Sequence, residues 1–152
     1  KECLGKAVLQ RFCSTARDEI RQAGCEKRSD PLERVFAALD CLPGSSKHGS
    51  KHQGCLIATF IQEMSQTHPE IQTMCVDSLR EWASMIKEDL RLAKESFVPD
   101  SPVNVESLAN YCVTVVEGAQ VLARATGKKK DMDESIKHLK NYLTLIFKPK
   151  QT

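Results

Sequence analysis

The sequence lacks the alternation of apolar and polar residues that marks β-strands, and its β-branched residues do not cluster between turn signals. It has no signal peptide and no apolar run near the roughly 18 residues needed to span a bilayer. Glycine-rich phosphate loops, His-Glu-x-x-His motifs, serine elbows and the Glu-x-x-His pairs of ferritin-like bundles are missing. A cysteine nucleophile with a distant histidine base is left open by sequence alone, and we expect no enzyme.

A large excess of charge is also missing. The net charge is +2 and the isoelectric point is near 8.2, whereas a nucleic-acid-binding domain usually shows a basic stripe and a value above about 9. The one dense basic run, Lys128 to Lys130, follows Gly127 and predicts a solvated connection between helices. If the whole protein binds DNA, we expect the groups that contact DNA to lie mostly outside this chain.

The cysteines are odd in number and widely spaced. The seven positions are Cys3, Cys13, Cys25, Cys41, Cys55, Cys75 and Cys112. Because the chain has no export signal, this pattern predicts free buried thiols in a cytoplasmic protein.

Four residues are candidates for a metal site. Cys41, His48, His52 and Cys55 have the ligand types of a zinc site, which commonly uses close cysteine and histidine pairs. Here the cysteines flank a loop instead of forming a pair. We therefore predict no metal and no cofactor.

The remaining pattern is that of a single all-α domain over residues 1–152. With 41% hydrophobic and 28% charged residues, a chain of this size buries roughly 68–70% of its unfolded surface and needs no cross-links. Apolar spacing predicts helices over 1–23, from Asp30-Pro31 to about 42, 54–67, 69–96, 103–126 and 131–147. The stretch 43–53, rich in Gly, Ser, Lys and His, predicts a surface loop.

Two helices carry most of the expected core. In the first helix, Leu4, Val8, Phe12 and Ala16 fall on one face, with Leu9 and Ile20 nearby. In the helix over 69–96, the predicted inward face consists of Ile71, Met74, Cys75, Leu79, Trp82, Met85, Ile86 and Leu90.

Three segments of the chain resemble one known family in the same order. The opening KECLGKAVLQRF, the segment GCLIATFIQEMSQTHPEIQ and the segment ESLANYCVTVVEGAQVLARATG are similar to the regulatory domain of TetR-type bacterial repressors. Many members with the Gly-Cys-Leu helix have Asn where this chain has Thr59. The order and spacing of the three segments make the resemblance fairly specific.

The resemblance implies a ligand-binding and dimerisation domain of about six helices. It implies a helix-turn-helix head upstream of residue 1, and residue 1, a lysine in a helix-like segment, fits a missing upstream part. A small molecule would change the separation of two DNA-reading heads, with residues 1–11 as the relay. The alternative is a helical homodimeric adaptor or metal-binding bundle without a DNA role.

Sensor pockets are concave and mostly apolar, with a few polar groups that fix ligand orientation. The side chains that we predict to contact a small-molecule effector are Phe12, Thr59, Glu63, Trp82, Met85 and Tyr111.

The last two helices are the expected site of dimerisation. The helix over 103–126 is apolar on most of its circumference, which requires burial on several sides, and closed two-fold pairs dominate soluble oligomers. The resemblance implies a four-helix bundle formed with a symmetry mate. The predicted interface residues are Leu108, Cys112, Val115, Ala119, Leu122, Ile136, Leu139, Leu143 and Ile146.

Overall fold

The computed structural model describes residues 2–22, 28–41, 54–64 and 66–148. The elements in this part of the chain are six helices: α1 (Glu2–Gln22), α2 (Pro31–Asp40), α3 (Leu56–Met64), α4 (Pro69–Phe97), α5 (Val105–Thr126) and α6 (Lys129–Phe147). The described residues contain no strand, which confirms the all-α prediction. The largest difference from the predicted bounds is at the end of α3, which lies at Met64 instead of residue 67, and the other bounds differ by at most two residues.

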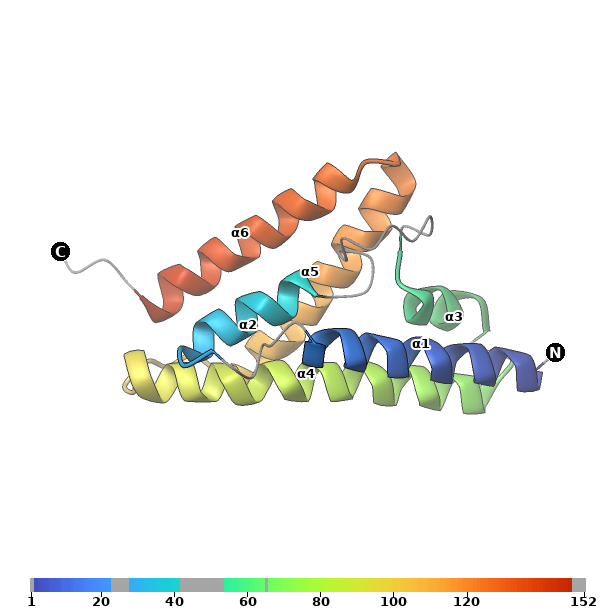
Figure 1. Ribbon diagram of the computed structural model, residues 1–152, viewed down its shortest axis with the longest axis horizontal. Helices are drawn as coiled ribbons and strands as arrows, with labels where there is room; N and C mark the ends of the chain where they lie inside the picture. Colours follow the sequence, from blue (N-terminus) through green and yellow to red (C-terminus); the bar gives the residue numbers. More distant parts are fainter. Residues whose placement is uncertain (1, 23–27, 42–53, 65, 149–152) are drawn as a thin grey trace.

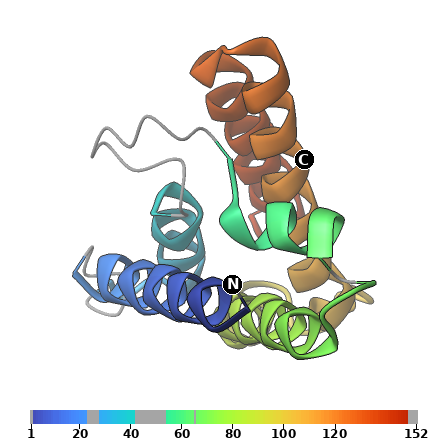
Figure 2. The same cartoon turned by 90° about the vertical axis from the view of Figure 1, so that its right-hand side faces the viewer.

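The long helix α4 is the base of the fold (Figure 1). The N-terminal helix α1 runs alongside it, and α5 and α6 form an antiparallel pair above it. Figure 2 shows α3 above α4 and beside α5. The turn between α5 and α6 depends on Gly127, which has a φ of 69° in the left-handed region that favours glycine.

Local sequence signals explain where two helices begin. The Asp30 carboxylate accepts hydrogen bonds from the backbone N–H groups of Leu32 and Glu33, and Pro31 occupies the first turn of α2. The Asn104 side chain caps α5 in the same way. Each cap satisfies backbone donors that the first turn of a helix leaves without partners.

The buried side chains form two clusters with α4 in common. The main cluster joins α2, α4, α5 and α6, and includes Leu32, Trp82, Val116 and Leu143. The minor cluster joins α1, α3 and α4, and consists of Leu9, Cys13, Cys55, Ile57, Ile71 and Cys75. We call the boundary between the two clusters, where Trp82 of the main cluster and Ile57 of the minor cluster line one cleft, the seam.

The inward face of α1 differs from the predicted one. Leu9, Cys13 and Ala16 are buried, whereas Leu4 and Val8 are 69% and 42% exposed. The buried positions are four and three residues apart, as helix geometry requires. Because Leu4 and Val8 also have helical spacing, apolar periodicity alone did not identify the face that packs on α4.

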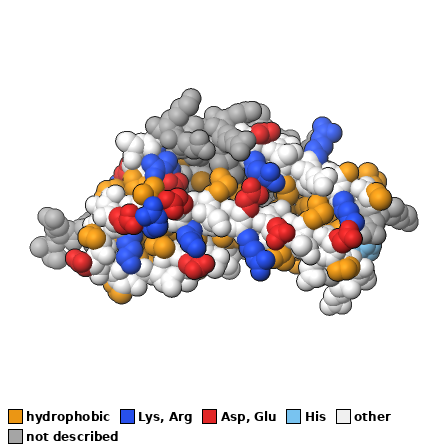
Figure 3. All heavy atoms as spheres, turned by 90° about the horizontal axis from the view of Figure 1, so that it is seen from below, with side chains coloured by type: hydrophobic (Ala, Val, Ile, Leu, Met, Phe, Trp, Pro, Cys, Tyr) orange, Lys and Arg blue, Asp and Glu red, His pale blue; other side chains and the backbone are white. Residues whose placement is uncertain are grey.

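The outer face of the molecule along α4 carries charges of both signs, as Figure 3 shows. Arg91 illustrates the pattern, since its guanidinium pairs with Glu88 and Glu95 on the same helix. This surface is a solvated helix face without a basic stripe. None of the described helices is long and apolar enough to span a membrane.

Candidate ligand-binding seam

A small cleft opens where α1, α3 and α4 meet. Its volume is about 20 Å³, enough for about one water molecule, whereas ligand pockets usually measure about 300–1,000 Å³. The cleft as seen is therefore closed to a ligand. Its lining residues are Phe12, Cys13, Ala16, Arg17, Ile57, Ser78, Glu81 and Trp82.

Polar contacts join the α1 and α4 walls of this cleft. The Cys13 thiol lies 3.2 Å from the Ser78 hydroxyl, and the Arg17 guanidinium lies 3.3 Å from the Glu81 carboxylate. The second pair is half-exposed, and such pairs usually contribute 0–1 kcal/mol. These polar contacts therefore hold the α1 and α4 walls together only weakly.

On α5, near the other side of the seam, Gln120 is buried and Glu117 is half-buried with both carboxylate oxygens shielded from solvent. Gln120 is 1% exposed, and both polar atoms of its amide lack a hydrogen-bond partner among the described residues. The same holds for both carboxylate oxygens of Glu117, one turn earlier on the same face. Unsatisfied buried polar groups are rare in folded proteins.

The Glu117 carboxylate lies against the Cys55 thiol. Burial raises the pKa of Glu117, and the contact with the Cys55 thiol only partly opposes the rise. Burial and the Glu117 carboxylate together raise the pKa of the Cys55 thiol to about 12. The thiol approaches the carboxylate, yet neither carboxylate oxygen has a hydrogen bond of good geometry.

The face of α5 that carries Glu117 and Gln120 looks toward α3. One turn beyond Gln120, the Arg124 guanidinium donates a 2.9 Å hydrogen bond to the Thr59 hydroxyl on α3. Cys55, beside Glu117, is two residues from Ile57, which lines the cleft. The start of α3 therefore connects the Trp82 cleft with the buried polar pair.

The structure brings together some of the predicted ligand contacts. Phe12 and Trp82 line the same cleft, and Thr59 lies next to the seam through its bond to Arg124. Glu63 is exposed, and Met85 and Tyr111 are 39% and 48% exposed. None of these last three side chains lines the cleft.

Most of the predicted interface residues lie in the core of a single chain. Leu108, Cys112, Ala119, Ile136, Leu139 and Leu143 are at most 6% exposed. Val115 and Ile146 are half-buried, and Leu122 is 48% exposed. The six buried side chains pack between α5, α6 and the helices beneath them, so these six do not form the surface that α5 and α6 offer to a partner.

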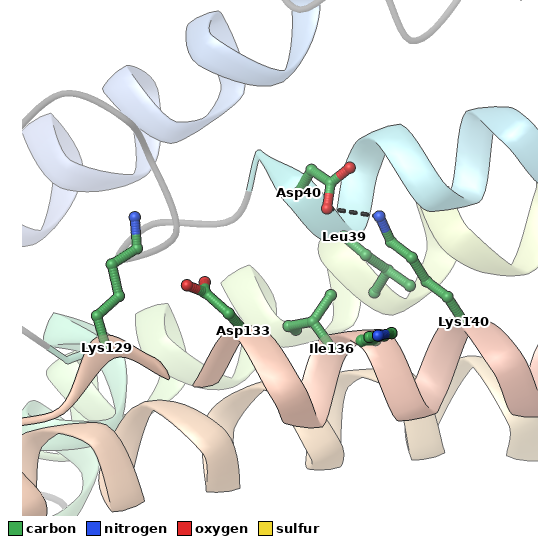
Figure 4. Close-up of a pocket in the computed structure, with 7 residues that line it drawn as sticks. Leu39, Asp40, Lys129, Asp133, Ile136 and Lys140 are labelled. Atoms are coloured by element: carbon green, nitrogen blue, oxygen red, sulfur yellow. Dashed lines mark hydrogen bonds and ion pairs between the residues drawn. The ribbon is translucent and has the colours of Figure 1, made fainter. Parts of the chain in front are cut away.

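A larger groove of about 550 Å³ lies between the end of α2 and α6 (Figure 4). The carboxylate of Asp40 pairs with the ammonium of Lys140 at 2.5 Å, and Lys129 and Asp133 also line the groove. Opposite charges that face each other in an open groove are typical of a solvated surface. The seam, with its apolar walls and buried polar pair, fits the chemistry of a ligand site better.

His48 and His52, from the tested zinc group, lie outside the described residues. Within the part of the chain that the structure describes, no three His, Cys, Asp or Glu side chains are grouped so that they could hold a metal ion.

Comparison with known families gives one match. The family model described as tetracyclin repressor-like, C-terminal domain, matches residues 31–139, more than half of the chain. The chain belongs to this family. No curated protein and no solved structure matched. The matched range of this TetR-like domain includes α2 to α5 and the first part of α6, so the Glu117 and Gln120 side of the seam lies inside it and the α1 wall of the cleft lies outside.

Glu117 and Gln120 are not among the site residues that the sequence patterns predict. The available signal was two polar residues at i and i+3 on a helix that is otherwise apolar on most sides. Glutamate and glutamine are usually exposed, so the default interpretation places them in solvent, and only tertiary packing shows that they are buried.

Proposed function

We propose that this chain is the ligand-sensing and dimerisation domain of a bacterial TetR-type transcriptional repressor, in which a bound small molecule changes the affinity for operator DNA. The observation that carries the proposal is the buried, unpartnered pair Glu117 and Gln120 beside a closed cleft, in a chain that belongs to the family. The proposal assigns no catalytic step to the chain and places the DNA-reading head upstream of residue 1.

The position of the cleft supplies a route for coupling. Phe12, Cys13 and Arg17 on α1 form one wall, and the minor cluster packs α1 on α4. Because the closed cleft has no room for a ligand, an occupant must displace α1 relative to α4. We propose that residues 1–11, which include the start of α1, carry this displacement to the head.

A small displacement is sufficient in this scheme. Operator half-sites are about 34–36 Å apart, so a change in the separation of two heads weakens DNA binding. The ligand must bind the open and closed arrangements unequally, and DNA must affect ligand affinity reciprocally, with a coupling of about 1–3 kcal/mol.

Dimerisation is proposed through the outer face of α5 and α6. The exposed side chains Tyr111, Leu122, Tyr142 and Leu145 are 47–67% exposed, and the rings of Tyr111 and Tyr142 stack edge to face at 5.7 Å. Gly118 lies between Tyr111 and Leu122 on the same face, with open space where a Cβ would stand, so a second helix could approach closely. We propose that the occupant is the same face of a second copy.

Sedimentation velocity of the purified chain tests the dimer. The expected mass is twice the 17.0 kDa of one chain, and Leu145→Glu should yield monomer because it places a charge in an apolar interface. Leu4→Glu is the matched control, since Leu4 on α1 is 69% exposed and Leu145 is 67% exposed. A monomeric wild type, or a dimer that Leu145→Glu leaves intact, would contradict the proposed interface.

A further inference from the structure

The buried polar atoms of Glu117 and Gln120 include more hydrogen-bond acceptors than donor groups. An ionised Glu117 offers two acceptor oxygens and no donor, and the amide of Gln120 offers one acceptor oxygen and one NH₂ donor. Among the described residues, none of these atoms has a hydrogen-bond partner. A complementary ligand group must therefore donate several hydrogen bonds to one small region.

Glu117 forms no ion pair within the described part of the chain, so its charge is uncompensated whenever it is ionised. Arg124, two turns further along α5, donates to Thr59. A buried charge is tolerated when it is paired and hydrogen-bonded. An ammonium group supplies both the opposite charge and up to three donors, whereas a carboxylate ligand would repel Glu117.

The cleft, on the other side of the start of α3, offers apolar side chains to a ligand that opens it. Phe12, Ile57 and Trp82 line it, and Trp82 is the single tryptophan of the chain. Aromatic faces attract cations as well as apolar groups, and tryptophan attracts them most strongly.

We propose that the seam binds an organic amine, with its ammonium group on Glu117 and Gln120 and its apolar body against Trp82. This inference rests on the proposed ligand-sensing function and specifies the chemical class of the effector. Neutral donors would bind more weakly because they lack the charge, and anions would bind least.

Three probes of nearly equal shape test the class: phenethylamine, 2-phenylethanol and 3-phenylpropionate. Each is titrated against the purified chain, with the thermal midpoint and Trp82 fluorescence as readouts. Phenethylamine should raise the midpoint most and change the Trp82 emission. Glu117→Gln, which keeps the shape and removes the charge, should weaken amine binding by about tenfold or more, the usual effect of one charge-assisted hydrogen bond.

Glu106→Gln is the matched control, because it removes an exposed carboxylate from the same helix and should leave the amine affinity unchanged. Gln120→Met is a second variant in the seam and should also weaken the amine. An amine preference that survives in Glu117→Gln would overturn the proposal. Stabilisation by 3-phenylpropionate equal to that by the amine would overturn the ligand class and leave the sensing function standing. If none of the three probes has an effect, the amine site is overturned, while sedimentation tests the dimer independently.

Discussion

Replacing Gln120 by methionine is expected to raise the thermal stability of the chain. The side chain is 1% exposed, and both polar atoms of its amide lack partners among the described residues. Burying an unsatisfied polar group costs about 1–3 kcal/mol. Methionine has a similar length and shape and no group that needs a hydrogen bond, so the substitution should remove most of this cost.

The expected shift follows from the size of the chain. For a domain of about 150 residues, 1 kcal/mol changes the midpoint by about 2–4 °C, so Gln120→Met should raise it by about 2–12 °C. Differential scanning calorimetry at one fixed chain concentration is the assay, because the midpoint of a dimer depends on concentration. Gln72→Met, at an exposed position on α4, is the control and should change stability by less than about 0.5 kcal/mol.

A midpoint that falls in Gln120→Met would refute the reasoning, because it would mean that the amide makes hydrogen bonds that stabilise the fold. If Gln120→Met raises the thermal midpoint and also loses amine binding, this result would support the view that Gln120 is retained for ligand recognition although it lowers stability.

Three further predictions concern the fold and its pH dependence. The folded-state pKa of Glu117 is raised above its ordinary value of 4.5. The stabilisation that comes from the proton bound to Glu117 is therefore present below pH 4.5 and is lost as the pH rises through the raised pKa. In urea unfolding, Glu117→Gln should be more stable than wild type at about pH 8 and equal to it at about pH 4. Burial acts to raise the pKa of Asp30, but hydrogen bonds from Lys148 and the α2 backbone outweigh it and leave the pKa below 3.8. Asp30→Ala should lower the free energy of unfolding by about 1 kcal/mol at neutral pH, and this loss of stability should shrink in acid. Leu143→Ala should cost about 2–5 kcal/mol in chemical unfolding, because Leu143 is fully buried between helices; an unchanged midpoint would place Leu143 outside the core.

The sequence patterns predict where the helices lie, but they do not predict which face of each helix is buried. Proline, Asp30 and apolar spacing indicate where α2 and α4 begin, because these signals are local. The face of α1 was mistaken because Leu4 and Val8 have the same helical spacing as the buried Leu9 and Cys13. Which of two apolar stripes is buried depends on packing against α4, and periodicity does not contain that information.

The candidate site was predicted in part for the same reason. Phe12 and Trp82 were identified because aromatic residues on an inward face favour a cavity wall, and both line the cleft. Glu117 and Gln120 were missed because burial of a polar side chain is an exception that the tertiary structure creates. The predicted interface on Leu108 and Leu139 reflects the strongest apolar stripe, which the chain uses for its own core.

The most direct test of the central claim is the fluorescence of Trp82 in the presence of compounds that stabilise the chain. Because the chain has one tryptophan and its side chain lines the cleft, its emission reports directly on occupancy of the seam. We predict that each stabilising compound changes the Trp82 emission over the same concentration range in which it raises the midpoint. Stabilising compounds that leave this emission unchanged would show that the ligand binds elsewhere and would contradict the account.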